Sequence, residues 1–165
     1  MIKKRTPLEY ILYTLTIALG IGIDQLTKLL SAEYLAPIDT HPIIEGVIHL
    51  TYVENRGAAF GMLADNRWIF MVVSTVAIIA MLLYLYLGHA ENTLMAVSLA
   101  MIISGGIGNM IDRLALGYVV DFIDFRLINF AVFNGADSFV CVGAALLLLS
   151  IFLYEAKNKD SKDKK

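Results

Sequence analysis

The sequence predicts an α-helical integral membrane protein with four transmembrane helices and a small extracytoplasmic sheet or loop subdomain. The first observation is composition. Of 165 residues, 58% are hydrophobic and 17% are charged, and the mean hydropathy is +0.70, whereas soluble domains have roughly 45–50% apolar and about 25% charged residues. The second is a set of four long apolar segments, and the third is the clustering of basic residues at the two chain ends. The length favours one membrane domain, residues 1–165.

The four apolar segments each come close to the roughly 20 residues that cross a bilayer. The first, about residues 10–30, contains Asp24 and Lys28 and is not followed by a clear cleavage site. We therefore interpret it as an uncleaved span rather than a signal peptide. The remaining spans are predicted at about residues 68–87, 93–111 and 137–154.

Two longer polar segments, about residues 31–67 and 112–136, connect the spans. Residues 47–53 (VIHLTYV) are rich in β-branched and aromatic residues and predict a strand. A single strand needs partners, so we expect a small sheet resting on the membrane. The second segment is predicted as a short loop carrying Asp121 and Asp124. Glycines and prolines exclude a long helix from the first segment: Pro37, Pro42, Gly46, Gly57 and Gly61.

Basic residues predict the orientation in the membrane, because Lys and Arg favour cytoplasmic flanks. They precede the first span at residues 3–5 and follow the last span in residues 155–165, predicted as a solvated tail. Both termini should therefore be cytoplasmic, which requires an even number of spans. The two polar segments then share the extracytoplasmic face.

With this topology, the unusual polar residues all fall on one side of the membrane. Ionisable groups at the edge of lipid are costly and usually functional. We therefore expect a single polar site at the outer membrane boundary. Its members come from spans and connecting segments alike: Asp24, Lys28, Asn55, Arg56, Asn109, Asp112, Arg113, Asp121 and Asp137.

Asp121 and Asp137 are the residues we expect to perform chemistry at this site. Two carboxylates about 3 Å apart cannot both ionise, so one keeps a proton near neutral pH. The ionised member can take a proton from water while the protonated member hydrogen-bonds a carbonyl, which is general acid–base hydrolysis. The sequence contains no zinc-binding H-E-x-x-H pattern and no G-x-S-x-G nucleophile motif.

The other polar residues have structural interpretations too. Asp24 and Lys28 lie one helical turn apart and can neutralise each other or steady the site. Asp112 and Arg113 can form a structural ion pair. The turn before Asp137 can be a helix cap. Ser104 and Gly108 predict a close approach of helix backbones. Three amides can hold loop backbone or peptide groups of a substrate: Asn55, Asn109 and Asn134.

Several alternatives remain open from the residues alone. Asp124, three residues after Asp121, is a rival for the catalytic role. An ion-coupled transporter would use intramembrane Asp and Lys to carry protons. A metal-dependent enzyme acting on lipid headgroups would use the carboxylates as metal ligands. A purely structural membrane subunit would use them neither to carry protons nor to bind a metal.

Five blocks of the sequence, in order and spread over nearly the whole chain, resemble the signal peptidase II family of bacterial lipoprotein signal peptidases. They are DQLTK (24–28), ENRGAAFG (54–61), GNMIDR (108–113), GYVVDFIDF (117–125) and FNGADS (133–138). The sequence departs from the family pattern at Gly135, where a bulkier apolar residue is expected.

The resemblance implies an aspartic endopeptidase of the bacterial plasma membrane, active without cofactor or metal, with an extracytoplasmic β-cradle and a small helix over the site. Its substrates would be diacylglyceryl-modified prolipoproteins, cleaved just before the lipidated cysteine, and its partners would be membrane lipid and not nucleic acid. We expect a monomer. The family's catalytic aspartates correspond to Asp121 and Asp137, and positions that line or support the site correspond to Asp24, Lys28, Asn55, Gly57, Asn109, Asp112, Arg113 and Asn134.

Overall fold

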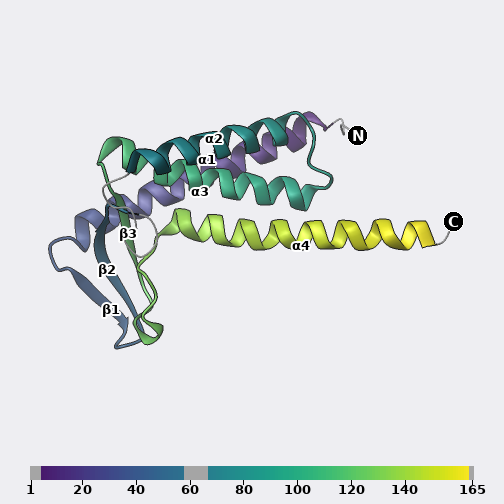
Figure 1. The fold of residues 1–165 in the computed structure, drawn as a ribbon. Coiled ribbons are helices and arrows are strands. Elements are labelled where there is room, and N and C mark those ends of the chain that lie inside the picture. The colour runs from purple at the N-terminus through teal and green to yellow at the C-terminus, as the bar shows by residue number, and fades with distance from the viewer. Residues whose placement is uncertain (1–4, 58–66, 164–165) are drawn as a thin grey trace.

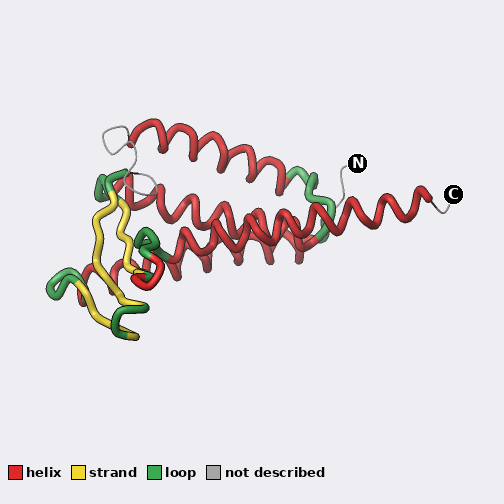
Figure 2. Tube along the Cα trace, turned by 60° about the horizontal axis from the view of Figure 1, so that its bottom comes forward, coloured by secondary structure: helices red, strands yellow, loops and turns green. Residues whose placement is uncertain are grey.

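Four helices and a three-stranded sheet make up the computed structural model, which describes residues 5–57 and 67–163. The helices are α1 (Pro7–Tyr34), α2 (Arg67–Tyr86), α3 (Thr93–Ala115) and α4 (Gly135–Asp163). The helices run side by side, and the sheet lies across one end of them (Figures 1 and 2). This arrangement confirms the predicted fold class of a helical membrane protein with a small sheet.

Three of the described helices are long and apolar enough to cross a membrane: Pro7–Tyr34, Thr93–Ala115 and Gly135–Lys159. The shorter apolar stretch Met71–Tyr86 lies in α2. α4 begins two residues before the predicted fourth span and continues to Asp163, so most of the segment predicted as a solvated tail is helical. At 29 residues, α4 is about 43 Å long, more than the hydrocarbon thickness of a bilayer.

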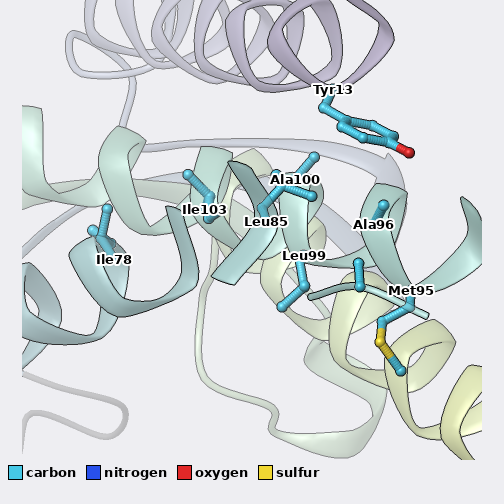
Figure 3. Packing of buried hydrophobic residues seen from close by; sticks show 9 residues of the cluster. Tyr13, Ile78, Leu85, Met95, Ala96, Leu99, Ala100 and Ile103 are labelled. Carbon is cyan, nitrogen blue, oxygen red and sulfur yellow. The ribbon is translucent and has the colours of Figure 1, made fainter. Parts of the chain in front are cut away.

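α3 forms the centre of the helical packing. Its face carrying Leu99, Ala100 and Ile103 is buried against Tyr13 of α1 and Leu85 of α2 (Figure 3). Small residues on α3 let the neighbouring helices come close. A Cβ atom added at Gly105 would collide with the carbonyl oxygen of Ala136 at the start of α4. Ser104 fills the space beside Gly20 of α1, and Gly108 lies against Asp24, which agrees with the close approach predicted from Ser104 and Gly108.

The sheet has the order β1–β2–β3, all antiparallel, with β1 at Thr40–Ile44, β2 at Ile48–Asn55 and β3 at Val119–Asp124. β2 corresponds to the strand predicted at residues 47–53. β3 corrects the prediction of a loop around Asp121, because Val119–Asp124 pairs with β2. A single 3-10 turn, η3 (Arg126–Ile128), separates β3 from α4. Gly61, predicted as a turn position, lies outside the described residues.

Candidate active site

Asp121 lies in the middle of β3, and the residue is 1% exposed. The register between β2 and β3 pairs Val53 with Asp121 and brings Asn55, at the end of β2, close to it. The Nδ2 of Asn55 donates to Oδ2 of Asp121 at 2.8 Å, and the Nδ2 of Asn134 donates to Oδ1 at 2.6 Å. Both carboxylate oxygens of this buried side chain therefore have an amide donor.

Asp137 lies in the first turn of α4. Asn134 caps this helix, because its Oδ1 accepts the backbone N–H of Asp137 at 2.9 Å. Oδ2 of Asp137 accepts the backbone N–H of Asn134 at 3.3 Å, which closes a reciprocal cap. Asp137 is thus not the N-cap itself. A carboxylate in the first turn is also favoured by the helix dipole.

Asn109 on α3 and Asn134 link the two aspartates into one hydrogen-bonded chain. Asn109 donates through Nδ2 to Oδ1 of Asp137 at 2.8 Å, and its Oδ1 accepts from Nδ2 of Asn134 at 3.1 Å. Asn134 in turn donates to Asp121. The orientation of the Asn134 amide is fixed because its oxygen accepts a backbone N–H, which leaves only its Nδ2 for the carboxylate.

A pocket of about 450 Å³ contains both carboxylates. Its polar lining includes Asn55, Asn109, Arg113 and Ser138. The apolar part of the lining, here called the apolar wall, comes from Val119, Phe130, Ala131, Val132, Phe133 and Cys141. The pocket therefore joins groups able to transfer protons to a surface that suits apolar side chains.

The remaining predicted site residues lie behind the pocket. The Lys28 Nζ forms ion pairs with Asp24 at 2.9 Å and with Asp112 at 3.0 Å, and all three residues are almost fully buried. Asp24 and Lys28 therefore pair as predicted, whereas the predicted ion pair between Asp112 and Arg113 is wrong. Asp112 pairs with Lys28 because α1 and α3 pack directly against each other.

Arg113 and Gly57 connect α3 to the segment that follows β2. Arg113 Nη1 donates to the backbone carbonyl of Asn109 at 3.2 Å, and Nη2 to that of Gly57 at 3.5 Å. The backbone N–H of Gly57 donates to Oδ1 of Asn55 at 3.0 Å. This leaves the Nδ2 of Asn55 oriented toward Asp121. Gly57 thus supports the site through its backbone.

Asp124, the rival carboxylate, belongs to a different set of contacts. It accepts from Thr51 at 2.8 Å and from Arg126 at 2.9 Å, and it does not line the pocket. Burial alone would raise its pKa, but the hydrogen bonds from Arg126 and Thr51 outweigh burial and hold the pKa below its usual value. Asp124 is therefore an ionised structural group of the sheet.

Sequence reasoning missed two parts of the site. Gln25, within the DQLTK block, is the first, and its Nε2 donates to Oδ1 of Asp112 at 2.9 Å. An amide inside a membrane span is itself a signal for a buried partner. The apolar wall was also missed, although Phe130 and Phe133 lie in an aromatic-rich stretch directly before α4. Among the described residues, no three His, Cys, Asp or Glu side chains are grouped as metal ligands.

The helical membrane fold and a pocket with two carboxylates define the class of membrane-bound aspartic hydrolases. The family model described as signal peptidase (SPase) II matches residues 16–153. The chain therefore belongs to the signal peptidase II family, the aspartic peptidase family A8, and is a multi-pass membrane protein of bacteria. The predicted resemblance and enzyme class are thereby confirmed.

Curated relatives and solved structures agree with this assignment. The chain is 54% identical over 131 residues to the lipoprotein signal peptidase of Caldanaerobacter subterraneus subsp. tengcongensis, covering 79% of this chain and 89% of that protein. It is 47% identical over 148 residues to the lipoprotein signal peptidase of Clostridioides difficile strain 630, covering 90% and 99%. A solved bacterial membrane enzyme superposes with a TM-score of 0.80 at 29% identity, covering 100% of this chain and 96% of the other.

Proposed function

We propose that Asp121 and Asp137 are the catalytic pair with which this lipoprotein signal peptidase cleaves diacylglyceryl-modified prolipoproteins, just before the lipidated cysteine. The observation that carries the proposal is that both carboxylates line one pocket and are joined by hydrogen bonds through Asn134 and Asn109. Asn55, Asn109 and Arg113 line that pocket, and Gly57, Asn134, Asp24, Lys28 and Asp112 support it from behind.

The two carboxylates lie in different surroundings, which suits them to different roles. Burial raises the pKa of Asp121 to about 6, against the opposing hydrogen bond from Asn55 and with the help of the negative charge on Asp137. Asp121 is therefore the member that holds the shared proton. The helix dipole favours negative charge in the first turn of α4, which suits Asp137 to the role of general base.

Hydrolysis then proceeds by attack of water on the scissile carbonyl, with the two aspartates transferring the protons. Asp137 takes a proton from water as the water oxygen attacks the scissile carbonyl carbon, and Asp121 gives its proton to the carbonyl oxygen. The tetrahedral intermediate collapses when Asp137 passes its proton to the leaving nitrogen and Asp121 recovers a proton from a hydroxyl group. The C–N bond breaks, and both carboxyl groups return to their starting states without metal or cofactor.

The position of the site suits a substrate held by its lipid. The pocket lies where α3 ends and α4 begins, at the same end as the sheet. Acyl chains in the outer leaflet would present the adjacent peptide bond at this depth, so that lipid binding energy positions the scissile bond. The apolar wall of Phe130, Val132 and Phe133 would face apolar residues of the substrate.

The basic residues support the proposed orientation. Lys157 and Lys159 lie in the C-terminal part of α4, and this helix runs away from the sheet toward the C-terminus (Figure 1). We assign both termini to the cytoplasm and the site to the extracytoplasmic face of the plasma membrane. The chain would act as a single domain and a monomer. The transporter alternative needs carboxylates spread through the spans, whereas these gather at one end.

The pH dependence of cleavage should reveal the shared proton. Below about pH 6 Asp121 keeps its proton, and above that pH the proton leaves and the acid is lost. We expect kcat/KM, which reports the free enzyme, to fall as the pH rises through about 6. Initial rates at low substrate concentration would measure this. A kcat/KM that instead rises through this range to a plateau would show that Asp121 is not the acid.

Cleavage of a defined substrate tests the proposed function directly. Purified protein in liposomes should cleave a diacylglyceryl-modified prolipoprotein before the modified cysteine, equally well with and without EDTA. The same prolipoprotein lacking the lipid should be cleaved poorly, because the acyl chains no longer position it. Loss of activity in EDTA would favour the metal-dependent alternative, and equal cleavage of both substrates would contradict recognition through lipid.

A further inference from the structure

Two buried carboxylates behind the pocket each hold the backbone directly before one of the candidate catalytic aspartates. Oδ1 of Asp24 accepts the backbone N–H of Ala136 at 2.8 Å, and Ala136 precedes Asp137. Oδ2 of Asp112 accepts the backbone N–H of Val120 at 3.1 Å, and Val120 precedes Asp121. The position of each proposed catalytic carboxylate therefore depends on a second carboxylate that binds the backbone N–H of the preceding residue.

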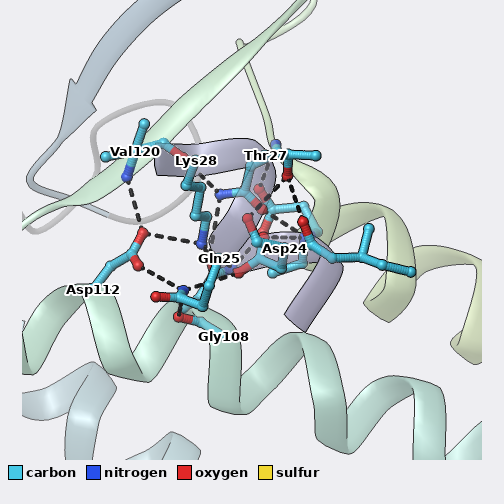
Figure 4. Close-up of polar contacts among 12 residues, drawn as sticks. Asp24, Gln25, Thr27, Lys28, Gly108, Asp112 and Val120 are labelled. Atoms are coloured by element: carbon cyan, nitrogen blue, oxygen red, sulfur yellow. Dashed lines mark hydrogen bonds and ion pairs between the residues drawn. The ribbon is translucent and has the colours of Figure 1, made fainter. Parts of the chain in front are cut away.

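The two supporting carboxylates are joined to each other at two points (Figure 4). The first is Lys28, whose Nζ contacts Asp24, Asp112 and, at 2.9 Å, Oδ1 of Asn109. The second is the side-chain amide of Gln25. Its Nε2 lies 3.2 Å from Oδ2 of Asp24, 2.9 Å from Oδ1 of Asp112 and 3.2 Å from the backbone carbonyl of Gly108 on α3.

Charge balance explains why a neutral donor is needed beside the lysine. Asp24 and Asp112 carry two negative charges, and Lys28 supplies one positive charge. A buried carboxylate is costly unless hydrogen-bond donors compensate it. Gln25 supplies N–H donors to both carboxylates, and its contact with α3 holds α1 in register. The charged groups that contact Gln25 are the carboxylates of Asp24 and Asp112. Lys28 lies between these two carboxylates, and the proposed catalytic pair on β3 and α4 lies beyond them.

We propose that Gln25 is a positioning residue which, by holding Asp24 and Asp112 together, fixes the separation of the two catalytic aspartates. This inference rests on the proposed function of Asp121 and Asp137. Gln25 does not line the pocket, so it acts on the reaction through the backbone of β3 and α4 and not through the substrate. Its loss should therefore lower kcat and leave KM almost unchanged.

Two substitutions separate this role from general support of the fold. Gln25→Leu removes the donors at similar size, and we expect kcat to fall on the order of tenfold with KM within about twofold, because misplaced catalytic groups slow the chemical step. Gln25→Glu keeps the shape and donates a hydrogen bond only while protonated. The ratio of its kcat to that of the wild type should fall as the pH rises, whereas the Gln25→Leu ratio should not change with pH.

Thr16→Val is a matched control on the same helix, because the Thr16 hydroxyl donates to the Leu12 carbonyl within α1. It should cleave at the wild-type rate. The melting curve of each variant gives its folded fraction at the assay temperature, and each rate is divided by that fraction. A wild-type kcat in Gln25→Leu, or a pH-independent ratio in Gln25→Glu, would overturn the inference. If instead wild-type protein fails to cleave, or Asp121→Asn cleaves normally, the proposed function fails.

Discussion

Replacing either Asp121 or Asp137 with asparagine should lower kcat by roughly 10³-fold or more, because an amide can neither release nor accept the shuttled proton. The change is almost isosteric, so the substrate pocket should keep its size. Single-turnover cleavage of a lipidated prolipoprotein would measure the loss. Melting curves are needed for Asp121→Asn, because its new Nδ2 would face the Nδ2 of Asn55 or Asn134.

The matched control is Asp124→Asn, which alters a carboxylate on the same strand but outside the pocket. It should cleave within about twofold of the wild type, because Asp124 serves Thr51 and Arg126 rather than the reaction. Substantial cleavage by Asp121→Asn or Asp137→Asn would sink the assignment of the pair. An inactive but folded Asp124→Asn would move the catalytic role to the rival carboxylate.

Replacing Lys28 with methionine should have the largest effect on stability. The substitution removes the cation shared by Asp24 and Asp112 and leaves two buried carboxylates facing each other. Removing one partner of a buried ion pair costs about 3–5 kcal/mol. Unfolding in detergent would show the loss, and cleavage should vanish with it because both backbone contacts of the supporting carboxylates are weakened.

Arg126→Met is the comparison for this second prediction. Arg126 pairs with Asp124 at 2.9 Å, but its side chain is 41% exposed. A solvent-exposed ion pair contributes about 1 kcal/mol or less, so this variant should unfold close to the wild type. A Lys28→Met protein as stable as Arg126→Met would show that water or rearrangement neutralises the buried carboxylates.

The helices could be predicted from the sequence because hydropathy over a long window depends little on tertiary contacts. Their ends could not be predicted fully, since the start of α4 is fixed by its neighbour Asn134 and also by Asp24 of α1, which is far away in sequence. The sheet was only partly predictable. β2 has a β-branched and aromatic pattern that predicts a strand. β1 contains Pro42, which disfavours a strand prediction. β3 contains two aspartates, which favour a loop prediction despite its Val119-Val120 and Phe122-Ile123 pairs.

For the site, too, composition predicts the general location of polar residues but not their individual contacts. Membrane topology was enough to predict that polar residues gather at one end, because charge in lipid is costly wherever it occurs. The identity of each partner was not predictable from spacing. Asp112 has Arg113 beside it in sequence but pairs with Lys28, 84 positions away, and the role of Gln25 depends on the distance between two helices.

The hydrogen-bonded amides between the two aspartates also limit which substitutions could make this protein resistant to an inhibitor. A compound that hydrogen-bonds Asn109 and the aspartates occupies groups that already hold one another in place. On the proposed assignment of the catalytic pair, a substitution that weakened such a compound should also lower cleavage. Resistance should therefore arise among the apolar lining residues Phe130, Val132 and Phe133, which take no part in the proposed proton transfers. Compounds that rely little on that wall should be the hardest to escape.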